Sequence, residues 1–151
     1  MNSLARPLVA LIVSFVPFFP LAAAPENAAE IMAKTLDNVK LSGYFTVTGK
    51  DKPPKKESYI IPSVAKAPGD NDLWIIDYRF EKGGKTVDLP LPLPVKWAGD
   101  KPVIYMDNLT IPGLGTFSAF VLFDDGKYAG TWAHGKTTGH LYGTLAKREG
   151  E

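Results

Sequence analysis

Gly83-Gly84 separates two runs that have an apolar or aromatic residue at every second position. These two glycines constrain the fold more than any other feature of the sequence. Both glycines can adopt the positive φ angles that a two-residue hairpin turn requires, which sets the register of the two flanking strands. Four facing pairs of one side are then all apolar or aromatic: Phe80–Val87, Tyr78–Leu89, Ile76–Leu91 and Trp74–Leu93. The other side pairs Arg79 with Asp88, an expected cross-strand ion pair. A slip of one residue would mix the two sides, so the pattern favours this register strongly.

The second strand of this hairpin contains VDLPLPLPVKW, with a proline at every second position. In the predicted register Pro90, Pro92 and Pro94 point their backbone away from the preceding strand, and proline has no N–H to donate. We therefore expect a seam, a gap between the strands at about 85–97 and 102–110. Two uses of the seam remain open: a route for an apolar ligand or a partner's strand, and protection of a sheet edge against aggregation. Replacing Pro92 with Val or Thr is expected to close it.

A second tight turn, Asp125-Gly126, predicts another hairpin, in which large and small side chains alternate across one face. Its facing pairs are Phe123–Tyr128, Val121–Gly130, Ala119–Trp132 and Phe117–His134. The predicted strands are 41–49, 57–66, 72–82, 85–97, 102–110, 115–124, 127–134 and 139–147. No connection is long enough for a crossover helix, so the sheet is antiparallel. We predict an all-β fold, an eight-stranded meander forming a small barrel of lipocalin-like topology by strand count. The alternative is a two-sheet β-sandwich split at the seam.

One helix is predicted, at about 26–38, because apolar residues recur there at spacings of three and four. The stripe consists of Ala28, Met32, Leu36 and Val39. We expect this helix to pack outside the barrel or across one end. We also expect it to cover Phe120 and Leu122, which point away from the inner face and would otherwise be exposed.

The first 24 residues are typical of a secretory signal peptide. Arg6 is their only charge, an apolar run covers Leu8–Leu21, and Ala22-Ala23-Ala24 follows as a small-residue cleavage site. Pro17 and Pro20 break the run, which disfavours a retained membrane anchor. We expect an exported protein, periplasmic or extracellular, with a single domain at 25–151 and no transmembrane segment after cleavage. The sequence has no cysteine, which excludes disulfides and a lipid-modified cysteine.

Charge excludes one class of partner. Without Arg6, sixteen basic residues balance sixteen acidic ones, whereas nucleic-acid binding needs a clustered positive face. The one basic cluster, Lys50–Lys56, contains two prolines. A solvated loop explains it better than contact with an anionic envelope surface.

Two resemblances are present. YAGTWAHGKTTGHLYG, residues 128–143, resembles the MORN repeat, a family whose arrays scaffold proteins or lie at membranes. A single copy cannot build such an array, so we interpret it as a hairpin with glycines opposite aromatics. WAGDKPVI, IPGLGTFSAFVLF and YAGTWAHG are also similar to a set of exported bacterial proteins of unknown function. That resemblance implies a shared fold and export, and it implies no activity.

Candidate binding residues come from the predicted inner face: Trp74, Tyr78, Trp97, Tyr128, Trp132 and His134. Plain core filling explains the aromatic residues, and a ligand cavity is the sharper alternative, since eight-stranded barrels are either filled or hold one small ligand. We predict no cofactor and no metal site, because His134 and His140 are expected on opposite faces of their hairpin. Asp77 and Arg79 are assigned to the outer face, and no serine lies in a nucleophile motif.

Three functions remain open. The first is an exported, non-catalytic barrel that binds a small apolar or aromatic ligand or an envelope protein. The second is a hydrolytic enzyme with a site near His134, and the third is a purely structural envelope protein. A cavity lined by Trp and Tyr would favour the first, and a carboxylate or hydroxyl hydrogen-bonded to His134 in a pocket would favour the second.

Overall fold

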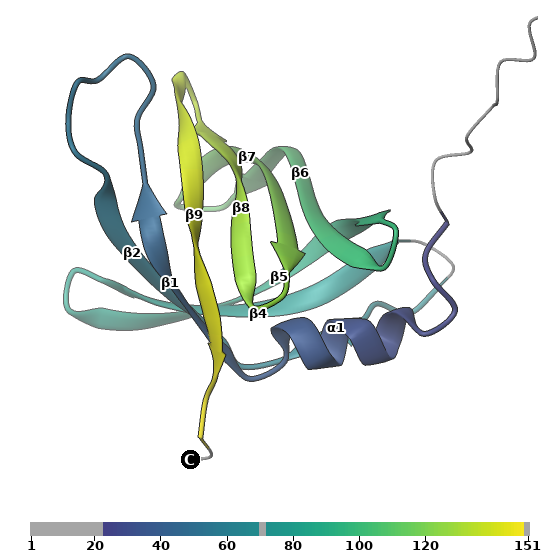
Figure 1. Ribbon diagram of the computed structural model, residues 1–151. Coiled ribbons are helices and arrows are strands. Elements are labelled where there is room, and N and C mark those ends of the chain that lie inside the picture. Colours follow the sequence, from purple (N-terminus) through teal and green to yellow (C-terminus); the bar gives the residue numbers. More distant parts are fainter. Residues whose placement is uncertain (1–22, 70–71, 150–151) are drawn as a thin grey trace, which may run out of the picture.

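Nine antiparallel strands and one helix follow each other along the chain in the computed structural model, which describes residues 23–69 and 72–149 (Figure 1). The elements are α1 (Ala28–Leu36), β1 (Val39–Phe45), β2 (Lys55–Ile61), β3 (Val64–Lys66), β4 (Leu73–Lys82), β5 (Lys85–Ala98), β6 (Lys101–Ile111), β7 (Gly115–Asp124), β8 (Lys127–His134) and β9 (Thr137–Lys147). The predicted signal peptide lies outside the described residues, apart from Ala23 and Ala24. Within the described part, no helix has the length and apolar character needed to span a membrane.

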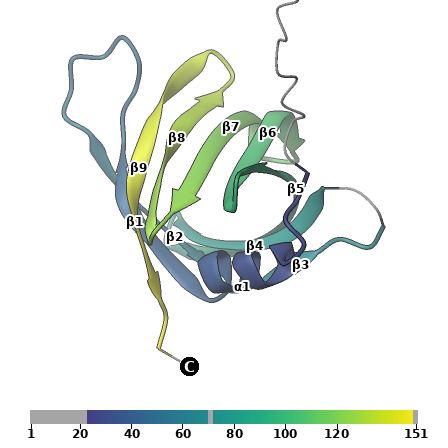
Figure 2. The same ribbon diagram turned by 45° about the vertical axis from the view of Figure 1, so that its right-hand side comes forward.

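The strands close into a barrel of eight strands, with the short β3 as an addition (Figure 2). Strands that follow each other in the chain pair side by side, except β2 and β3. β9 pairs with β1, and a bridge between Ile60 of β2 and Arg79 of β4 completes the ring. The predicted antiparallel barrel is confirmed, and the sandwich alternative is wrong because the sheet closes on itself. The strand expected at 57–66 is interrupted at Pro62-Ser63, and its second part pairs with β4 as β3.

Both predicted hairpin registers are confirmed. β4 and β5 pair from Lys82–Lys85 back to Trp74–Leu93, and β7 and β8 pair from Asp124–Lys127 back to Phe117–His134. The turn residues have the positive φ angles that these turns require, 60° and 75° at Gly83 and Gly84. On the outer face, Arg79 Nε lies 2.6 Å from Asp88 Oδ1.

The expected seam is present between β5 and β6. Their pairing covers four positions, from Ala98–Lys101 to Val95–Ile104, and stops where the prolines begin. β6 contributes a second irregularity that the proline pattern did not indicate. Its register against β7 shifts between Met106 and Leu109, and Asn108 has a φ of 51°. If the β5–β6 register were continued, this bulge would lie beside Pro92, so both strands lose regular pairing at the same level.

α1 lies across one end of the barrel and packs against β3 and β6 (Figures 1 and 2). Met32 and Leu36 are fully buried there, in one core cluster with the barrel residues. The expectation that the helix covers Phe120 and Leu122 is wrong: Phe120 is 50% exposed, and Leu122 remains partly exposed. An open barrel end leaves several core side chains uncovered at once, so the helix buries more apolar surface there than over two residues of β7.

Candidate functional site

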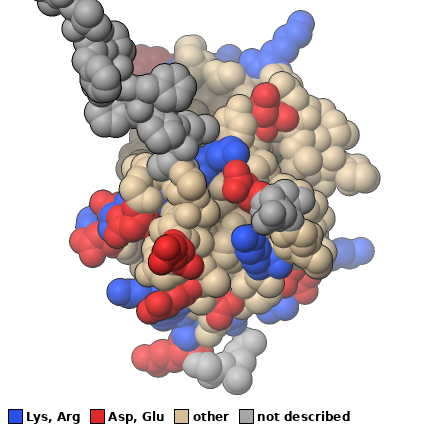
Figure 3. Space-filling view, turned by 90° about the vertical axis from the view of Figure 1, so that its right-hand side faces the viewer, with Lys and Arg blue, Asp and Glu red and all other residues tan. Residues whose placement is uncertain are grey.

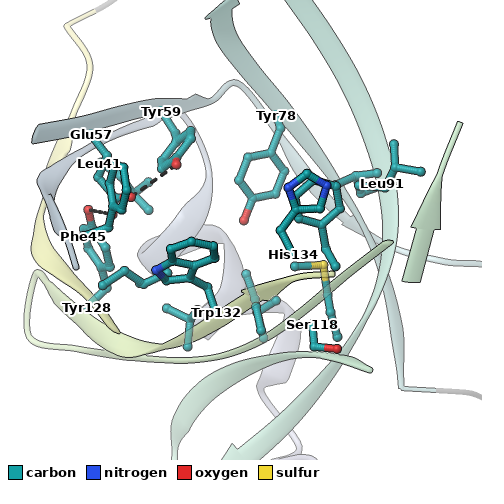
Figure 4. Close-up of a pocket in the computed structure, with 17 residues that line it drawn as sticks. Leu41, Phe45, Glu57, Tyr59, Tyr78, Leu91, Ser118, Tyr128, Trp132 and His134 are labelled. Carbon is teal, nitrogen blue, oxygen red and sulfur yellow. Dashed lines mark hydrogen bonds between the residues drawn. The ribbon is translucent and has the colours of Figure 1, made fainter. Parts of the chain in front are cut away.

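An apolar cavity of about 360 Å³ lies inside the barrel, away from α1 (Figure 4). β1 begins directly after the helix, so its last residue, Phe45, lies at the far end of the barrel, and Phe45 lines the cavity. This volume lies at the lower end of the range for small-molecule sites, about 300–1,000 Å³. Most of the wall is apolar or aromatic, and few polar side chains reach it.

The structure brings together four of the six residues that the sequence suggested as a binding set. Tyr78, Tyr128, Trp132 and His134 line the cavity. Trp74 and Trp97 do not line this cavity; both are buried in the core cluster. They share the inner face with the others, but they lie in the part of the barrel that core side chains fill.

Glu57 is the one carboxylate among the lining residues, and two tyrosines hold it (Figure 4). Tyr128 Oη donates to Glu57 Oε1 at 2.9 Å, and Tyr59 Oη donates to Oε2 at 3.2 Å. Both carboxylate oxygens therefore act as acceptors, the arrangement expected of the ionised form. The three groups come from β2 and β8, which are separated around the barrel by β1 and β9.

Two glycines make this long-range contact possible. Glu57 pairs with Gly43, Gly43 with Gly143, and Gly143 with Tyr128, so the four residues form one row across β2, β1, β9 and β8. A Cβ on Gly43 would lie 2.5 Å from Tyr128 Oη, and one on Gly143 would lie 2.8 Å from Tyr128 Cε1. The tyrosine ring thus occupies the space that two missing side chains leave open, and its hydroxyl reaches the carboxylate.

Trp132 is positioned in the same way. It pairs with Gly139, where a Cβ would lie 2.7 Å from its indole nitrogen, and Nε1 donates to the carbonyl oxygen of Thr46 at 3.2 Å. Phe45 packs edge-to-face against the indole, with ring centroids 5.8 Å apart. Glycines opposite aromatic residues, expected from the 128–143 stretch, thus build one wall of the cavity.

Burial dominates the ionisation of these groups. It raises the pKa of Glu57 above its ordinary value by more than the two tyrosine hydrogen bonds lower it. Burial and the adjacent Glu57 charge hold the pKa of Tyr59 and of Tyr128 well above the usual range, and together they raise the pKa of Tyr78 to about 12. All three tyrosines therefore remain neutral hydroxyl groups near neutral pH.

His134 lies at the mouth, the open end of the cavity, where its ring stacks on Phe117 with centroids 4.2 Å apart and planes 10° apart. Within the described chain, no carboxylate or hydroxyl is hydrogen-bonded to the His134 ring. His140 pairs with Thr131 and lies on the outer face near Thr46, so the two histidines do not converge. Stacking makes His134 an aromatic part of the rim, and none of the described residues orients its ring in the way that hydrolysis requires.

The mouth continues toward the seam. A second hollow shares Tyr78, Phe117 and His134 with the cavity and extends along β5 to Leu89 and to Leu114 in the β6–β7 turn. Pro90 and Pro92 are exposed on the outside of this same strand, while Leu91 lines the cavity from the inside. The part of β5 that does not pair with β6 therefore borders both the cavity and its mouth.

Sequence reasoning missed Glu57, although a signal was present. It directly follows the basic Lys50–Lys56 stretch, which suggested a solvated loop and drew attention away from the strand. The alternation of Glu57 with Tyr59 and Ile61 places its side chain on the inner face, and this pattern could have identified it. Comparison with known protein families, with curated proteins and with solved structures finds no match for this chain.

Proposed function

We propose that this protein is a non-catalytic binding protein that takes one small, largely apolar or aromatic ligand into its barrel. The cavity is the main support for this proposal, because a barrel selected only for stability would be filled by side chains. Its walls combine aromatic surface with a few convergent polar groups, the usual composition of a small-molecule site. The space beside Tyr78, Tyr128 and Trp132 supports this function over a purely structural one.

The proposal includes export. The first 24 residues have the charge, apolar run and small-residue site of a signal peptide, so we place the mature protein in the periplasm or outside the cell. The charge distribution supports a ligand other than nucleic acid: on the face in Figure 3, basic and acidic side chains are interspersed. An envelope protein at the seam remains a second partner class, supported by the unpaired edge of β5.

A fluorescence titration tests the proposed function. N-phenyl-1-naphthylamine, a neutral apolar dye that brightens in apolar sites, is expected to bind the wild-type protein at one site. Ala119 lines the cavity on β7, so Ala119→Leu fills part of the space and weakens dye binding by roughly tenfold or more. Ala129 is exposed on the outer face of β8, and Ala129→Leu serves as the matched control.

Equal dye binding by both variants would place the dye outside the barrel and contradict the proposal. Circular dichroism of each variant shows that the fold is retained. Native mass spectrometry of protein purified from its source adds an independent readout, because a retained ligand appears as a discrete mass increment.

A further inference from the structure

Glu57 introduces a carboxylate into a cavity whose wall is otherwise mostly apolar or aromatic. Its two oxygens accept hydrogen bonds from neutral tyrosine hydroxyls, and among the described residues no lysine or arginine forms an ion pair with it. An ionised carboxylate removed from water is costly unless a positive charge compensates it. The raised pKa of Glu57 has the same origin, since burial outweighs both hydrogen bonds.

Aromatic rings surround the space beside this carboxylate. Phe45 and Trp132 form one edge-to-face pair, and Tyr59 and Tyr78 form another, with centroids 6.4 Å apart. The hydroxyl of Tyr78 makes no hydrogen bond to another described residue and points toward the cavity (Figure 4). Ring faces carry partial negative charge, so this wall attracts a cation as well as an apolar group.

We propose that the cavity takes an organic cation, an apolar amine or quaternary ammonium, with its positive group near Glu57 and against the aromatic rings. This inference rests on the proposed function and names the chemical class of its ligand. A cation supplies the counter-charge that no lysine or arginine of the described chain supplies by an ion pair, whereas an anion is repelled by Glu57. A neutral ligand displaces water from the carboxylate and returns no charge, which makes the burial of Glu57 more costly.

Two probes of the same shape test the charge. Benzyltrimethylammonium is the cation, and neopentylbenzene replaces its nitrogen with carbon. Binding of each to the full chain is measured by ligand-observed NMR and by displacement of N-phenyl-1-naphthylamine. The wild-type protein is expected to bind the cation about tenfold or more tightly than the neutral isostere, the scale of a hydrogen-bond or contact energy that involves a charged group.

Glu57→Gln keeps the side-chain shape and removes the charge. This substitution is expected to weaken binding of the cation by about tenfold or more. Binding of neopentylbenzene should be unchanged or tighter. Glu30 is exposed on α1, so Glu30→Gln is the matched control, and it should leave the binding of both probes unchanged. Equal binding of the two probes to wild type, or unchanged cation binding by Glu57→Gln, overturns the inference.

The outcomes separate the two proposals. If the neutral dye binds in the cavity and the cation does not, the inference is wrong while the proposed function stands. If the cation binds and the dye does not, the inference stands and an apolar ligand without charge is excluded. Binding of neither overturns both.

The pH dependence of probe affinity in the wild-type protein is a test that does not require Glu57→Gln to fold. Cation affinity is expected to fall as pH decreases through the raised pKa of Glu57, because the protonated carboxyl has no charge to offer, while neopentylbenzene affinity stays constant. A cation profile as flat as that of the neutral probe contradicts the inference.

Other charged or titratable groups also lie near Glu57 and bear on how the pH profile is interpreted. Inside the barrel, the neighbouring tyrosines of β2, β4 and β8 remain neutral at acid and neutral pH. On the outside, Lys40 of β1 and Lys56 of β2 border a hollow that Glu57 also reaches, and Lys56 and Glu81 of β4 line the mouth hollow together with Glu57. His134 lies at the mouth, so the profile is repeated in His134→Gln; the Glu57 effect persists in that variant.

Discussion

Glu57 owes its position to residues that are distant in sequence and adjacent in the sheet. Its partner Tyr128 lies 71 positions away and reaches it only because Gly43 and Gly143 leave a channel across two strands. Alternation along β2 is visible in the sequence, but the alignment of β2, β1, β9 and β8 in one row depends on barrel closure. Tyr128 and Trp132 were predictable as inward-facing residues, whereas the carboxylate that Tyr128 binds was not.

The half-buried carboxylate of Glu57 predicts a stability difference that depends on pH. Because the pKa of Glu57 is raised in the folded state, its ionisation disfavours folding, and this penalty grows as pH rises from its ordinary value of 4.5 through the raised value. Glu57→Gln lacks the penalty. We expect its melting temperature to exceed that of wild type at pH 7 and the difference to vanish below pH 4.5. Thermal melts of both proteins from pH 3.5 to pH 8 measure this; a difference independent of pH would assign it to packing rather than to charge.

Individual elements were predictable where local chemistry determines them. Gly83-Gly84 and Asp125-Gly126 specify their turns, and a two-residue turn leaves only one register for the strands it joins. The break at Pro62, which divides the expected strand 57–66, was less visible because one proline at a strand edge is tolerated. The expected cover of Phe120 and Leu122 by α1 was wrong, since a stripe of apolar residues shows that a helix face is buried and not which surface buries it.

The contacts of α1 predict how two substitutions in this helix affect stability. Leu36 is fully buried at the closed end of the barrel, and Lys147 Nζ donates to the carbonyls of Ala33 and Asp37 at 3.0 and 2.5 Å, which fastens the helix C-terminus to β9. Leu36→Ala is expected to lower the free energy of unfolding by about 2–5 kcal/mol. Lys34→Ala, at an exposed position of the same turn, should lower it by at most about 1 kcal/mol.

Urea denaturation measures both helix variants, and N-phenyl-1-naphthylamine is titrated into each without denaturant. Leu36 does not line the cavity, so dye affinity should be retained while stability falls. Equal losses of stability in the two variants would mean that the helix does not close the barrel end.

At the scale of the whole molecule, the barrel has a filled end and a hollow end. Alternation along each strand predicted which side chains face inward, but nothing in it distinguishes the two ends. Trp74 and Tyr78 lie on the same face of β4, yet the first is 4% exposed in the core and the second lines the cavity. The difference follows from the position of α1 and from the row of glycines, both of which are properties of the closed barrel.

The seam predicts an effect on the rates of ligand binding and release, because it borders the cavity, the mouth and the outer edge of β5. Replacing Pro90, Pro92 and Pro94 with Thr restores three N–H donors toward β6 and adds residues that favour strands. If the seam is the ligand's route, the variant should bind and release N-phenyl-1-naphthylamine several-fold more slowly in stopped-flow experiments, with little change in affinity, since one opening serves both directions.

Hydrogen exchange at the new amides reports whether pairing forms despite the bulge at Asn108. Pro53 and Pro54, exposed between β1 and β2, are replaced with Thr as the control. Protected amides with unchanged dye rates would exclude the seam as the route; self-association in size-exclusion chromatography would then identify edge protection as the role of the prolines.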